Sequence, residues 1–481
     1  MDALVKTGQS AISDFNDLLF RRVRPVGLRP THNLSSGNPS YAGFPPAVMA
    51  VQNVLQRGDM RIYATGAGYD REKSELLSFC NELGLRGGSP LTVNHLVMGL
   101  GATHLYFTAL MVLRERFHRE HSGKIPVILM TAPSYGLFTL QPEHHGFEIE
   151  TVPLRQEDDW VVEPEVVADK IRQIEHDGTR KVFVYYNINP HNPTGTVLNS
   201  EVIQPLAAVL EKHHVFAIDD FAYYGLEYEG QSDPIARYNP DRTITLFSCS
   251  KAFGMPRLRA GFACGSEDIM HKMNDSTSMQ MISLPAAVAP AVTSCYGEGN
   301  LEARQDYLAN NLRGYHQSFR LMKAMVCGIN SISAENHEKS SMTHVVREAI
   351  GDHKKAVEIL KTGMPSLELV NPDMKAGYFA MLRVRNIDQY YYGEKRLTNT
   401  FQFAAATIDA TSTLTLPMNC SVSSHCPDIL RVTFAGMAQR RVARALYNLY
   451  ETFSHLTSAP DSSKQKALVE KGLELNSRFD I

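Results

Sequence analysis

Lys251 is the residue whose type and surroundings most clearly indicate chemistry, because serines and arginines lie close to it in the sequence. A lysine acts as a nucleophile only after it loses its proton, and burial and neighbouring cations lower its pKa. Arg257 and Arg259 supply such positive charge. The hydroxyls of Ser248 and Ser250, together with an arginine, are also suited to binding an anion such as a phosphate. The segment therefore predicts a reactive lysine beside an anion site, while an exposed basic loop is the alternative explanation.

Two adjacent carboxylates, Asp219 and Asp220, directly follow the apolar run at 215–218. Burial of an unpaired charge costs several kcal/mol, so a carboxylate at this position needs a partner. A metal ion is one candidate partner, but the nearby histidines, His213 and His214, precede the strand and belong at its other end. The sequence therefore disfavours a metal and leaves the partner of these carboxylates open.

Three more loop segments follow apolar runs. Gly99 and Gly101 precede an amphipathic stretch that begins near His104, and backbone amides at such a helix start favour an anion. Tyr135 follows the next run and could stack on an aromatic ligand. Asn192 lies in a rigid Asn-Pro-Thr-Gly turn that can hold its amide toward a hydroxyl or phenolate oxygen. Each of these features taken singly also fits an ordinary turn or packing contact.

The elements that position these residues alternate along the chain. Apolar runs rich in β-branched residues occur at 126–130, 181–186, 215–218 and 244–247, and helical patterns occur at 46–55, 72–85 and 104–117. Continuous apolar strands separated by helices predict an α/β fold with a mainly parallel sheet covered on both faces. Ligands of such sheets bind in the loops beyond the strand ends, and the polar groups described above fall in those loops.

The second half of the chain predicts a smaller α/β unit. Helical patterns at 301–323 and 353–361 flank a polar loop at 335–341, and strand-like runs at 378–384 and 430–434 precede a helix at 439–453. We expect an N-terminal arm with part of the small domain at 1–45, a large domain at 46–315, a small domain at 316–455 and a polar tail at 456–481. The first 30 residues suit an arm or a short helix at 12–20, and the tail suits a loose segment or a short exposed helix.

Composition excludes several classes of protein. A formal net charge of -3 over 481 residues gives no electrostatic reason to expect nucleic acid or an anionic membrane as partner. No apolar run approaches the ~18 residues of a membrane span, and the first residues lack the features of a signal peptide. The seven cysteines include no C-x-x-C pair and are expected to be reduced thiols. These features predict a cytoplasmic protein.

Taken together and in order, the motifs resemble the fold-type I, pyridoxal-phosphate-dependent aminotransferases of class I/II. The motifs are Gly-Ala-Thr at 101–103, Pro-Ser-Tyr at 133–135, Asn-Pro-Thr-Gly at 192–195, Asp-x-x-Tyr at 220–223, Ser-x-Ser-Lys at 248–251 with an arginine eight residues on, and Leu-Arg-Val-Thr at 430–433. The resemblance covers most of the chain. It implies a large domain with a mainly parallel, seven-stranded sheet flanked by helices, and a smaller α/β domain built from both chain ends.

The resemblance also assigns roles around the coenzyme, pyridoxal 5'-phosphate. Lys251 would be the Schiff-base lysine, which holds the coenzyme and moves the proton of the substrate α-carbon. Asp220, which fits the family spacing better than Asp219, would pair with the pyridine nitrogen and make the ring an electron sink. Tyr223 and Asn192 would hydrogen-bond the 3-oxygen of the ring, and Tyr135 would stack on it.

The resemblance places a phosphate site and a substrate site as well. The phosphate would be bound by the backbone at Ala102 and Thr103, the hydroxyls of Ser248 and Ser250, and the Arg259 guanidinium. Tyr63 would reach the phosphate of a neighbouring subunit, which implies a homodimer with shared active sites. Arg431 would bind the substrate α-carboxylate through bidentate hydrogen bonds, near Asn192 and Gly37. Arg257 departs from the family pattern, which usually has glycine there.

The reaction implied is amino transfer between an L-amino acid and a 2-oxo acid. One fold hosts many chemistries, so decarboxylation, β/γ-elimination or cyclisation, and oxygen-dependent oxidation with the same coenzyme stay open. A non-catalytic, coenzyme-binding regulator is a further alternative. It is disfavoured because the residues ahead of the fold are too few and too weakly basic for a DNA-binding module.

Overall fold

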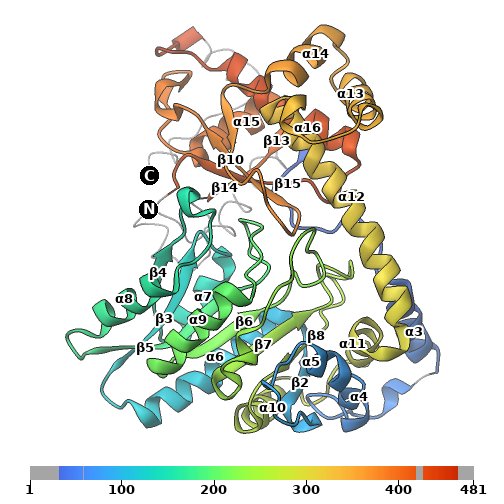
Figure 1. The fold of residues 1–481 in the computed structure, drawn as a ribbon, viewed down its shortest axis with the longest axis vertical. Helices are drawn as coiled ribbons and strands as arrows, with labels where there is room; N and C mark the ends of the chain where they lie inside the picture. Colours follow the sequence, from blue (N-terminus) through green and yellow to red (C-terminus); the bar gives the residue numbers. More distant parts are fainter. Residues whose placement is uncertain (1–31, 58, 419–425, 464–481) are drawn as a thin grey trace.

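The computed structural model describes residues 32–57, 59–418 and 426–463, which form two units joined by one long helix (Figure 1). The larger unit is built on a seven-stranded sheet, and the smaller unit contains a four-stranded sheet. The helix expected at 12–20 and the last part of the expected tail, residues 464–481, lie outside the described residues.

The large sheet has the strand order β2-β8-β7-β6-β5-β3-β4. Its strands are β2 (Leu96–Gly99), β3 (Ile125–Ala132), β4 (Glu148–Pro153), β5 (Arg180–Ile188), β6 (Phe216–Asp220), β7 (Thr243–Ser248) and β8 (Gly261–Cys264). Strand β8 runs antiparallel to both of its neighbours, and the other neighbouring pairs are parallel. The predicted seven-stranded, mainly parallel sheet is therefore confirmed, with β8 as the reversed strand.

Helices cover both faces of this sheet. One face packs against α6 (Gly101–Glu120) and α10 (Glu267–Met281), and the other packs against α8 (Pro164–Glu175) and α9 (Ser200–Lys212). Because side chains alternate along a strand, neighbouring residues enter different cores. In β6, Ile218 lies in the core under α6, while Ala217 lies in the core under α8 and α9.

The small sheet has the order β14-β15-β10-β9, and all of its pairs are antiparallel. Its strands are β9 (Leu367–Leu369), β10 (Phe379–Val384), β14 (Leu416–Pro417) and β15 (Ile429–Thr433). The helices of this unit are α13 (Asn336–Ile350), α14 (His353–Thr362), α15 (Thr400–Thr411) and α16 (Gln439–Glu451). Strand β1 (His32–Asn33) pairs in parallel with β13 (Thr413–Leu414), so the first described residues belong to the small unit.

Helix α12 (Leu301–Cys327) runs from the large unit to the small one and is seen along the right of Figure 1. Near its start, α3 (Pro45–Arg57) packs against α11 (Val288–Tyr296). The expected domain boundary between residues 315 and 316 falls inside α12. The four-part division of the chain therefore stays a prediction.

The prediction of one continuous helix at 72–85 is wrong. The structure has two short helices there, α4 (Asp70–Ser74) and α5 (Leu77–Glu82). The Leu76 amide donates to the Lys73 carbonyl three residues back, which tightens the turn and ends the first helix.

The polar loop expected at 335–341 is also wrong, because α13 begins at Asn336. The buried residues of α13 are Val346, Ala349 and Ile350, all in its last turns. Its first turns lack a buried stripe and so look like a loop in the sequence. In the described part of the polar tail, Thr457 pairs with Tyr391, and the Asp461 amide donates to the Gly393 carbonyl. The character of the tail as a whole stays a prediction.

No described helix has the length and apolar character needed to cross a lipid bilayer. The described residues also hold no group of three or more His, Cys, Asp or Glu side chains that could bind a metal ion. The cysteines that the structure describes are all free thiols.

Candidate active site

The predicted site residues come from loops at one edge of the large sheet. Parallel strands end at the same edge, so the loops after β3, β5, β6 and β7 lie together. These loops carry Tyr135, Asn192, Tyr223 and Lys251, while Asp220 is the last residue of β6. The small unit contributes Arg431 from β15.

Lys251 donates a hydrogen bond of 3.0 Å from Nζ to the carbonyl oxygen of Gly37. Burial lowers the pKa of this amine to about 8, and the charges of Arg431 and Arg259 act in the same direction. The charge of Asp220 partly opposes them. The lysine is therefore much more easily deprotonated than an exposed lysine, as a nucleophile requires.

Asp219 and Asp220 have different environments because they face opposite sides of the sheet. The Asp220 carboxylate accepts from the Tyr186 hydroxyl at 2.7 Å and from the Ala222 amide at 2.9 Å. Burial raises its pKa to about 6, against the effect of these donors and of the Lys251 charge. Asp220 is thus the carboxylate on the lysine side.

The Asp219 carboxylate is held inside the core instead. It accepts from the Asn187 side chain at 2.8 Å and from the Ile235 amide at 2.9 Å. Burial raises its pKa to about 7. Both of its oxygens are thus used to join β6 to β5 and to the turn at Ile235, which is a structural role.

Arg431 lies across the site from the lysine loop. Its guanidinium donates to the Ser35 carbonyl at 3.0 Å and to the Asn192 side-chain oxygen at 3.5 Å. Its Cζ atom lies 4.1 Å from the centroid of the Phe379 ring, which supports the guanidinium from one face. The arrangement brings the arginine and the asparagine together, as a carboxylate-binding pair requires.

The expected anion cradle is formed by the start of α6 and the lysine loop. Arg259 donates to the Leu100 carbonyl at 3.3 Å and to the Ser250 hydroxyl at 3.3 Å. The Ser248 hydroxyl donates to Ser250 at 2.9 Å. A Cβ on Gly101 would lie 3.1 Å from Arg259 Nη2, and Gly101 has φ +77°, so glycine allows this close approach.

The two remaining cradle residues, Ala102 and Thr103, occupy the first turn of α6. Backbone amides there have no partner within the helix, and the helix dipole favours an anion. Arg259 has no carboxylate within ion-pair distance in the described parts of the chain. The cradle therefore gathers hydrogen-bond donors and a positive charge, and no carboxylate in the described parts of the chain neutralises that charge.

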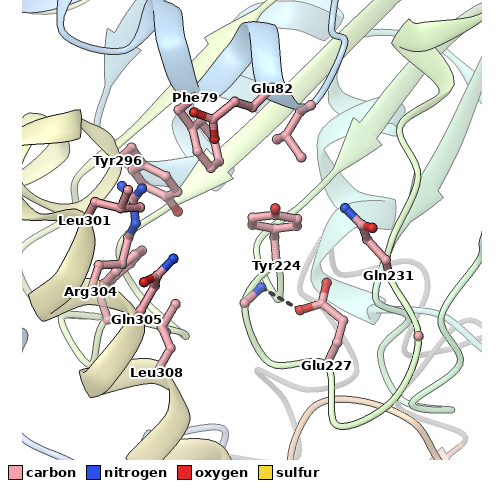
Figure 2. Close-up of a pocket in the computed structure, with 14 residues that line it drawn as sticks. Phe79, Glu82, Tyr224, Glu227, Gln231, Tyr296, Leu301, Arg304, Gln305 and Leu308 are labelled. Carbon is pink, nitrogen blue, oxygen red and sulfur yellow. Dashed lines mark hydrogen bonds between the residues drawn. The ribbon is translucent and has the colours of Figure 1, made fainter.

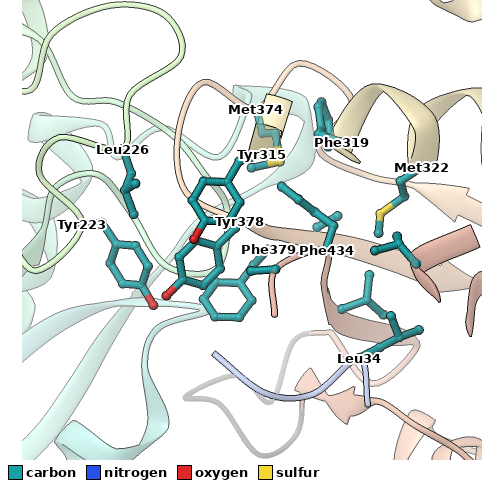
Figure 3. Close-up of a cluster of buried hydrophobic side chains, with 14 of the residues drawn as sticks. Leu34, Tyr223, Leu226, Tyr315, Phe319, Met322, Met374, Tyr378, Phe379 and Phe434 are labelled. Carbon is teal, nitrogen blue, oxygen red and sulfur yellow. The ribbon is translucent and has the colours of Figure 1, made fainter. Parts of the chain in front are cut away.

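Tyr223 and Tyr378 form an aromatic pair beside the lysine. Their ring centroids are 5.8 Å apart, and their hydroxyls point toward one another in Figure 3. Burial raises the pKa of both phenols, so both remain protonated at neutral pH. The Tyr378 hydroxyl donates to the Gly37 carbonyl at 2.9 Å, the same oxygen that accepts from Lys251.

Tyr135 and Tyr63 occupy contrasting positions. Tyr135 is half-buried, and burial raises its pKa while the charges of Arg431, Asp220 and Arg259 also act on it. This places it among the site residues. Tyr63 is 81% exposed. Its expected role across a subunit interface stays a prediction.

Two tyrosines of the site have no role in the sequence interpretation. Tyr186 lies inside an apolar run and carries no signal of a polar contact, although its hydroxyl binds Asp220. Tyr378 begins a strand-like run and reads as core. Arg257, which was expected to act on Lys251 together with Arg259, is exposed, and the charges that lower the pKa of Lys251 are those of Arg431 and Arg259.

Comparison with known proteins decides the family. The family described as aminotransferase class I and II matches residues 29–449, which is nearly the whole chain. The chain belongs to this family. The resemblance inferred from the motifs is therefore confirmed, and members of this aminotransferase family use pyridoxal 5'-phosphate.

Individual aminotransferases match shorter stretches. Aspartate/prephenate aminotransferase of Thermus thermophilus is 33% identical over 146 residues, which is 30% of this chain and 35% of the relative. Histidinol-phosphate aminotransferase of Haloferax volcanii is 28% identical over 191 residues, 38% of this chain and 50% of the relative. The chain thus aligns with half or less of the length of these two curated relatives.

Solved aminotransferase structures are similar over almost the whole chain. Aspartate aminotransferase from Thermus thermophilus with maleate has a TM-score of 0.70 at 19% identity, over 92% of this chain and 97% of that one. This likeness shows the fold, and the prediction of fold type I is confirmed.

The site residues of this chain fit the coenzyme of its family. An aldehyde requires an amine that loses its proton easily, and Lys251 supplies one. A phosphate requires several donors, and the Arg259 guanidinium and the start of α6 supply them. A ring nitrogen requires a buried carboxylate, and Asp220 is buried with both oxygens held in place.

A cavity of about 340 Å³ lies apart from this site, between α5 and α12 (Figure 2). Arg304 lines it and donates to the Cys295 and Gly297 carbonyls at 3.1 and 3.2 Å. Those carbonyls lie at the end of α11, so the arginine caps a helix C-terminus. Glu227 is held by the Gly225 amide at 2.7 Å. Arg304 and Glu227 therefore have structural roles.

Proposed function

We propose that the chain is an aminotransferase that moves an amino group between an L-amino acid and a 2-oxo acid. The observation that carries this proposal is the position of Lys251, an amine with a pKa of about 8, in the loop shared with Arg259 and electrostatically coupled to Asp220 and Arg431. When bound, the coenzyme withdraws electrons from the bonds at the substrate α-carbon. The work of the chain is to hold both partners and to move one proton.

Each residue has a defined task in this proposal. Lys251 holds the coenzyme at Nζ and then, as the free amine, takes the proton of the substrate α-carbon and returns it. Asp220 holds the ring nitrogen by its charge, while Tyr223 and Asn192 hold the ring oxygen. Tyr135 stacks on the ring.

Anion recognition is divided between two arginines. Arg259, Ser248, Ser250 and the first turn of α6 at 102–103 hold the phosphate. Arg431 holds the substrate carboxylate, and two parallel N–H donors fix its orientation. The Gly37 carbonyl and Asn192 border this substrate position, which is supported by their contacts with Lys251 and Arg431.

A homodimer with shared active sites belongs to the same proposal. Large apolar side chains are exposed on neighbouring segments, namely Met60 (57%), Ile62 (79%), Tyr63 (81%), Met279 (77%) and Ile282 (72%). The Ala64 amide donates to the Ser283 hydroxyl at 2.8 Å, so the two segments lie together. An exposed apolar patch of this kind supports an interface with a second copy, from which Tyr63 would reach the partner's phosphate.

The substrate side chain is left open by this proposal. The related proteins act, by their names, on aspartate, prephenate or histidinol phosphate. Those names support amino transfer as the reaction more than any one substrate. A cytoplasmic location stays a prediction from composition.

The test is a visible spectrum of the purified holoenzyme mixed with a panel of L-amino acids, with and without a 2-oxo acid and oxygen. Amino transfer predicts loss of the visible coenzyme band with one equivalent of 2-oxo acid released, and recovery of the band on addition of a 2-oxo acid. Continuous turnover without an acceptor, with release of carbon dioxide, ammonia or peroxide, would assign a lyase, decarboxylase or oxidase instead.

A further inference from the structure

Tyr186 is the second of two consecutive tyrosines in β5, and both are almost completely buried. Opposite β3, the pairing of β5 jumps from Val182 to Val184, which leaves one extra residue at Phe183. Such a bulge changes the phase of all later side chains. After it, Tyr186 enters the core under α6 and Tyr185 enters the core under α8 and α9.

The bulge therefore directs each tyrosine toward a different aspartate of the neighbouring strand. The Tyr186 hydroxyl donates to Asp220 Oδ2 at 2.7 Å. The Tyr185 hydroxyl lies on the Asp219 side and is buried without a hydrogen bond to any residue in the described parts of the chain. The two side chains are chemically identical neighbours, and one of them is bonded to the carboxylate of the proposed site.

The Asp220 carboxylate is fixed from two directions. The Ala222 amide donates to Oδ1 at 2.9 Å, and the Tyr186 hydroxyl holds Oδ2. The Tyr186 ring is itself held against Tyr106, with ring centroids 5.0 Å apart. A short hydrogen bond to a carboxylate favours its ionised form and sets its orientation. Because packing already holds the Tyr186 ring in place, its hydroxyl can bind the Asp220 carboxylate with little further loss of conformational entropy.

We propose that Tyr186 is a positioning residue that holds the Asp220 carboxylate charged and correctly oriented for the ring nitrogen of the coenzyme. This inference rests on the proposed function, in which Asp220 meets that nitrogen. It adds a residue outside the motif set, one that acts through Asp220 without a role of its own in proton transfer.

The experiment compares the dissociation constant of pyridoxal 5'-phosphate for the wild type, Tyr186→Phe and Tyr185→Phe, measured by absorbance after dialysis to the coenzyme-free protein. Tyr186→Phe removes one oxygen and keeps the ring. Loss of a hydrogen bond to a charged group predicts roughly ten- to hundredfold weaker binding. Tyr185→Phe removes an unbonded hydroxyl and is expected to bind the coenzyme within about twofold of the wild type.

A double-mutant cycle with Asp220→Asn separates positioning from a general structural effect. If Tyr186 acts through Asp220, adding Tyr186→Phe to Asp220→Asn changes the dissociation constant by less than about twofold. Equal losses in both backgrounds, wild-type affinity of Tyr186→Phe, or failure of that variant to fold would overturn the proposal. Melting temperatures of the coenzyme-free proteins monitor folding.

Failure of the proposed function gives a different result. A wild-type protein that does not bind the coenzyme refutes that function before any variant is compared. Tight binding by the wild type together with tight binding by Tyr186→Phe refutes only the role of Tyr186.

Discussion

The Nζ atom of Lys251 lies 3.0 Å from the carbonyl oxygen of Gly37, a residue 214 positions earlier in the chain. The hydroxyl of Tyr378, from the small unit, donates to the same oxygen at 2.9 Å. A side chain on residue 37 would place its Cβ 3.1 Å from Phe379 Cζ and 3.4 Å from the lysine nitrogen. The close approach of the N-terminal segment to the lysine therefore depends on glycine.

The pKa of Lys251 predicts the pH dependence of coenzyme attachment. Only the neutral amine reacts, and burial, Arg431 and Arg259 lower its pKa from 10.5 to about 8. The attachment rate of coenzyme to the coenzyme-free protein should therefore rise about tenfold per pH unit below that value and level off above it. Stopped-flow absorbance measures this rate.

Arg431→Gln provides the matched comparison, because it removes one of the charges that lower the pKa of Lys251. Its midpoint should move to higher pH. A wild-type midpoint near that of an exposed lysine would contradict the placement of Lys251 among these cations.

The two aspartates of β6 should respond differently to removal. Asp220→Ala should weaken coenzyme binding by about one to two orders of magnitude, because the charged partner of the ring is lost. Asp219→Ala should instead lower the free energy of unfolding by about 1–3 kcal/mol, because the donors at Asn187 and Ile235 lose their acceptor.

Coenzyme titration and denaturant unfolding of both variants check this pair. Each aspartate serves as the control for the other. Equal losses of coenzyme affinity would mean that the assignment of the two faces is mistaken.

The sequence could predict the aspartate pair but not which member faces the lysine. Side chains along a strand alternate between the two faces of the sheet. If the register is uncertain by one residue, the faces predicted for Asp219 and Asp220 are interchanged. The family spacing favours Asp220, and the hydrogen bonds show the two environments directly. The contact of Tyr186 with Asp220 could not be predicted for the same reason. The bulge at Phe183 determines on which face of the sheet Tyr186 lies, and nothing in the local sequence marks that bulge.

Other elements of the fold differ in how far their sequence could predict them. The strands at 126–130 and 244–247 could be predicted because continuous apolar runs indicate buried parallel strands. The first turns of α13 could not, because their side chains are not buried and give no apolar stripe. The direction of β8 depends on its pairing with β7 and β2, which is a tertiary property.

Arg431→Lys should raise the KM for both the amino acid and the 2-oxo acid by about tenfold or more, because one ammonium cannot replace a guanidinium that binds a carboxylate through two donors. Coenzyme attachment to Lys251 should persist. Steady-state kinetics and the visible spectrum measure the two effects.

Arg383→Lys is the matched control for this substitution. Arg383 lies on the neighbouring strand β10 and pairs with Glu368 and Asp428, each at 3.0 Å. The Arg383→Lys substitution should leave the KM values for the amino acid and the 2-oxo acid unchanged. A similar rise in KM for both variants would contradict a specific role of Arg431.

The expected position of Tyr63 in the partner's site predicts complementation between an impaired variant, Tyr63→Ala, and an inactive one, Lys251→Ala. In a shared-site dimer, Tyr63→Ala weakens phosphate binding and Lys251→Ala removes the nucleophile. A hybrid dimer of the two contains one site with an intact lysine from one chain and an intact tyrosine from the other. Co-expression with different affinity tags should therefore give hybrid dimers with about half the wild-type activity.

The outcome of that experiment also reports on assembly. Sedimentation of the wild type should give the mass of two chains, and the 81% exposure of Tyr63 should fall in the dimer. Hybrids without activity, or an active monomer, would contradict a site shared between subunits.

Borohydride reduction of the purified holoenzyme, followed by peptide mass spectrometry, shows whether Lys251 carries the coenzyme. We expect a pyridoxyl-phosphate mass on the peptide that contains Lys251, and neither this mass nor any turnover in Lys251→Ala. A reduced adduct on another lysine, or retained turnover in Lys251→Ala, would contradict this expectation.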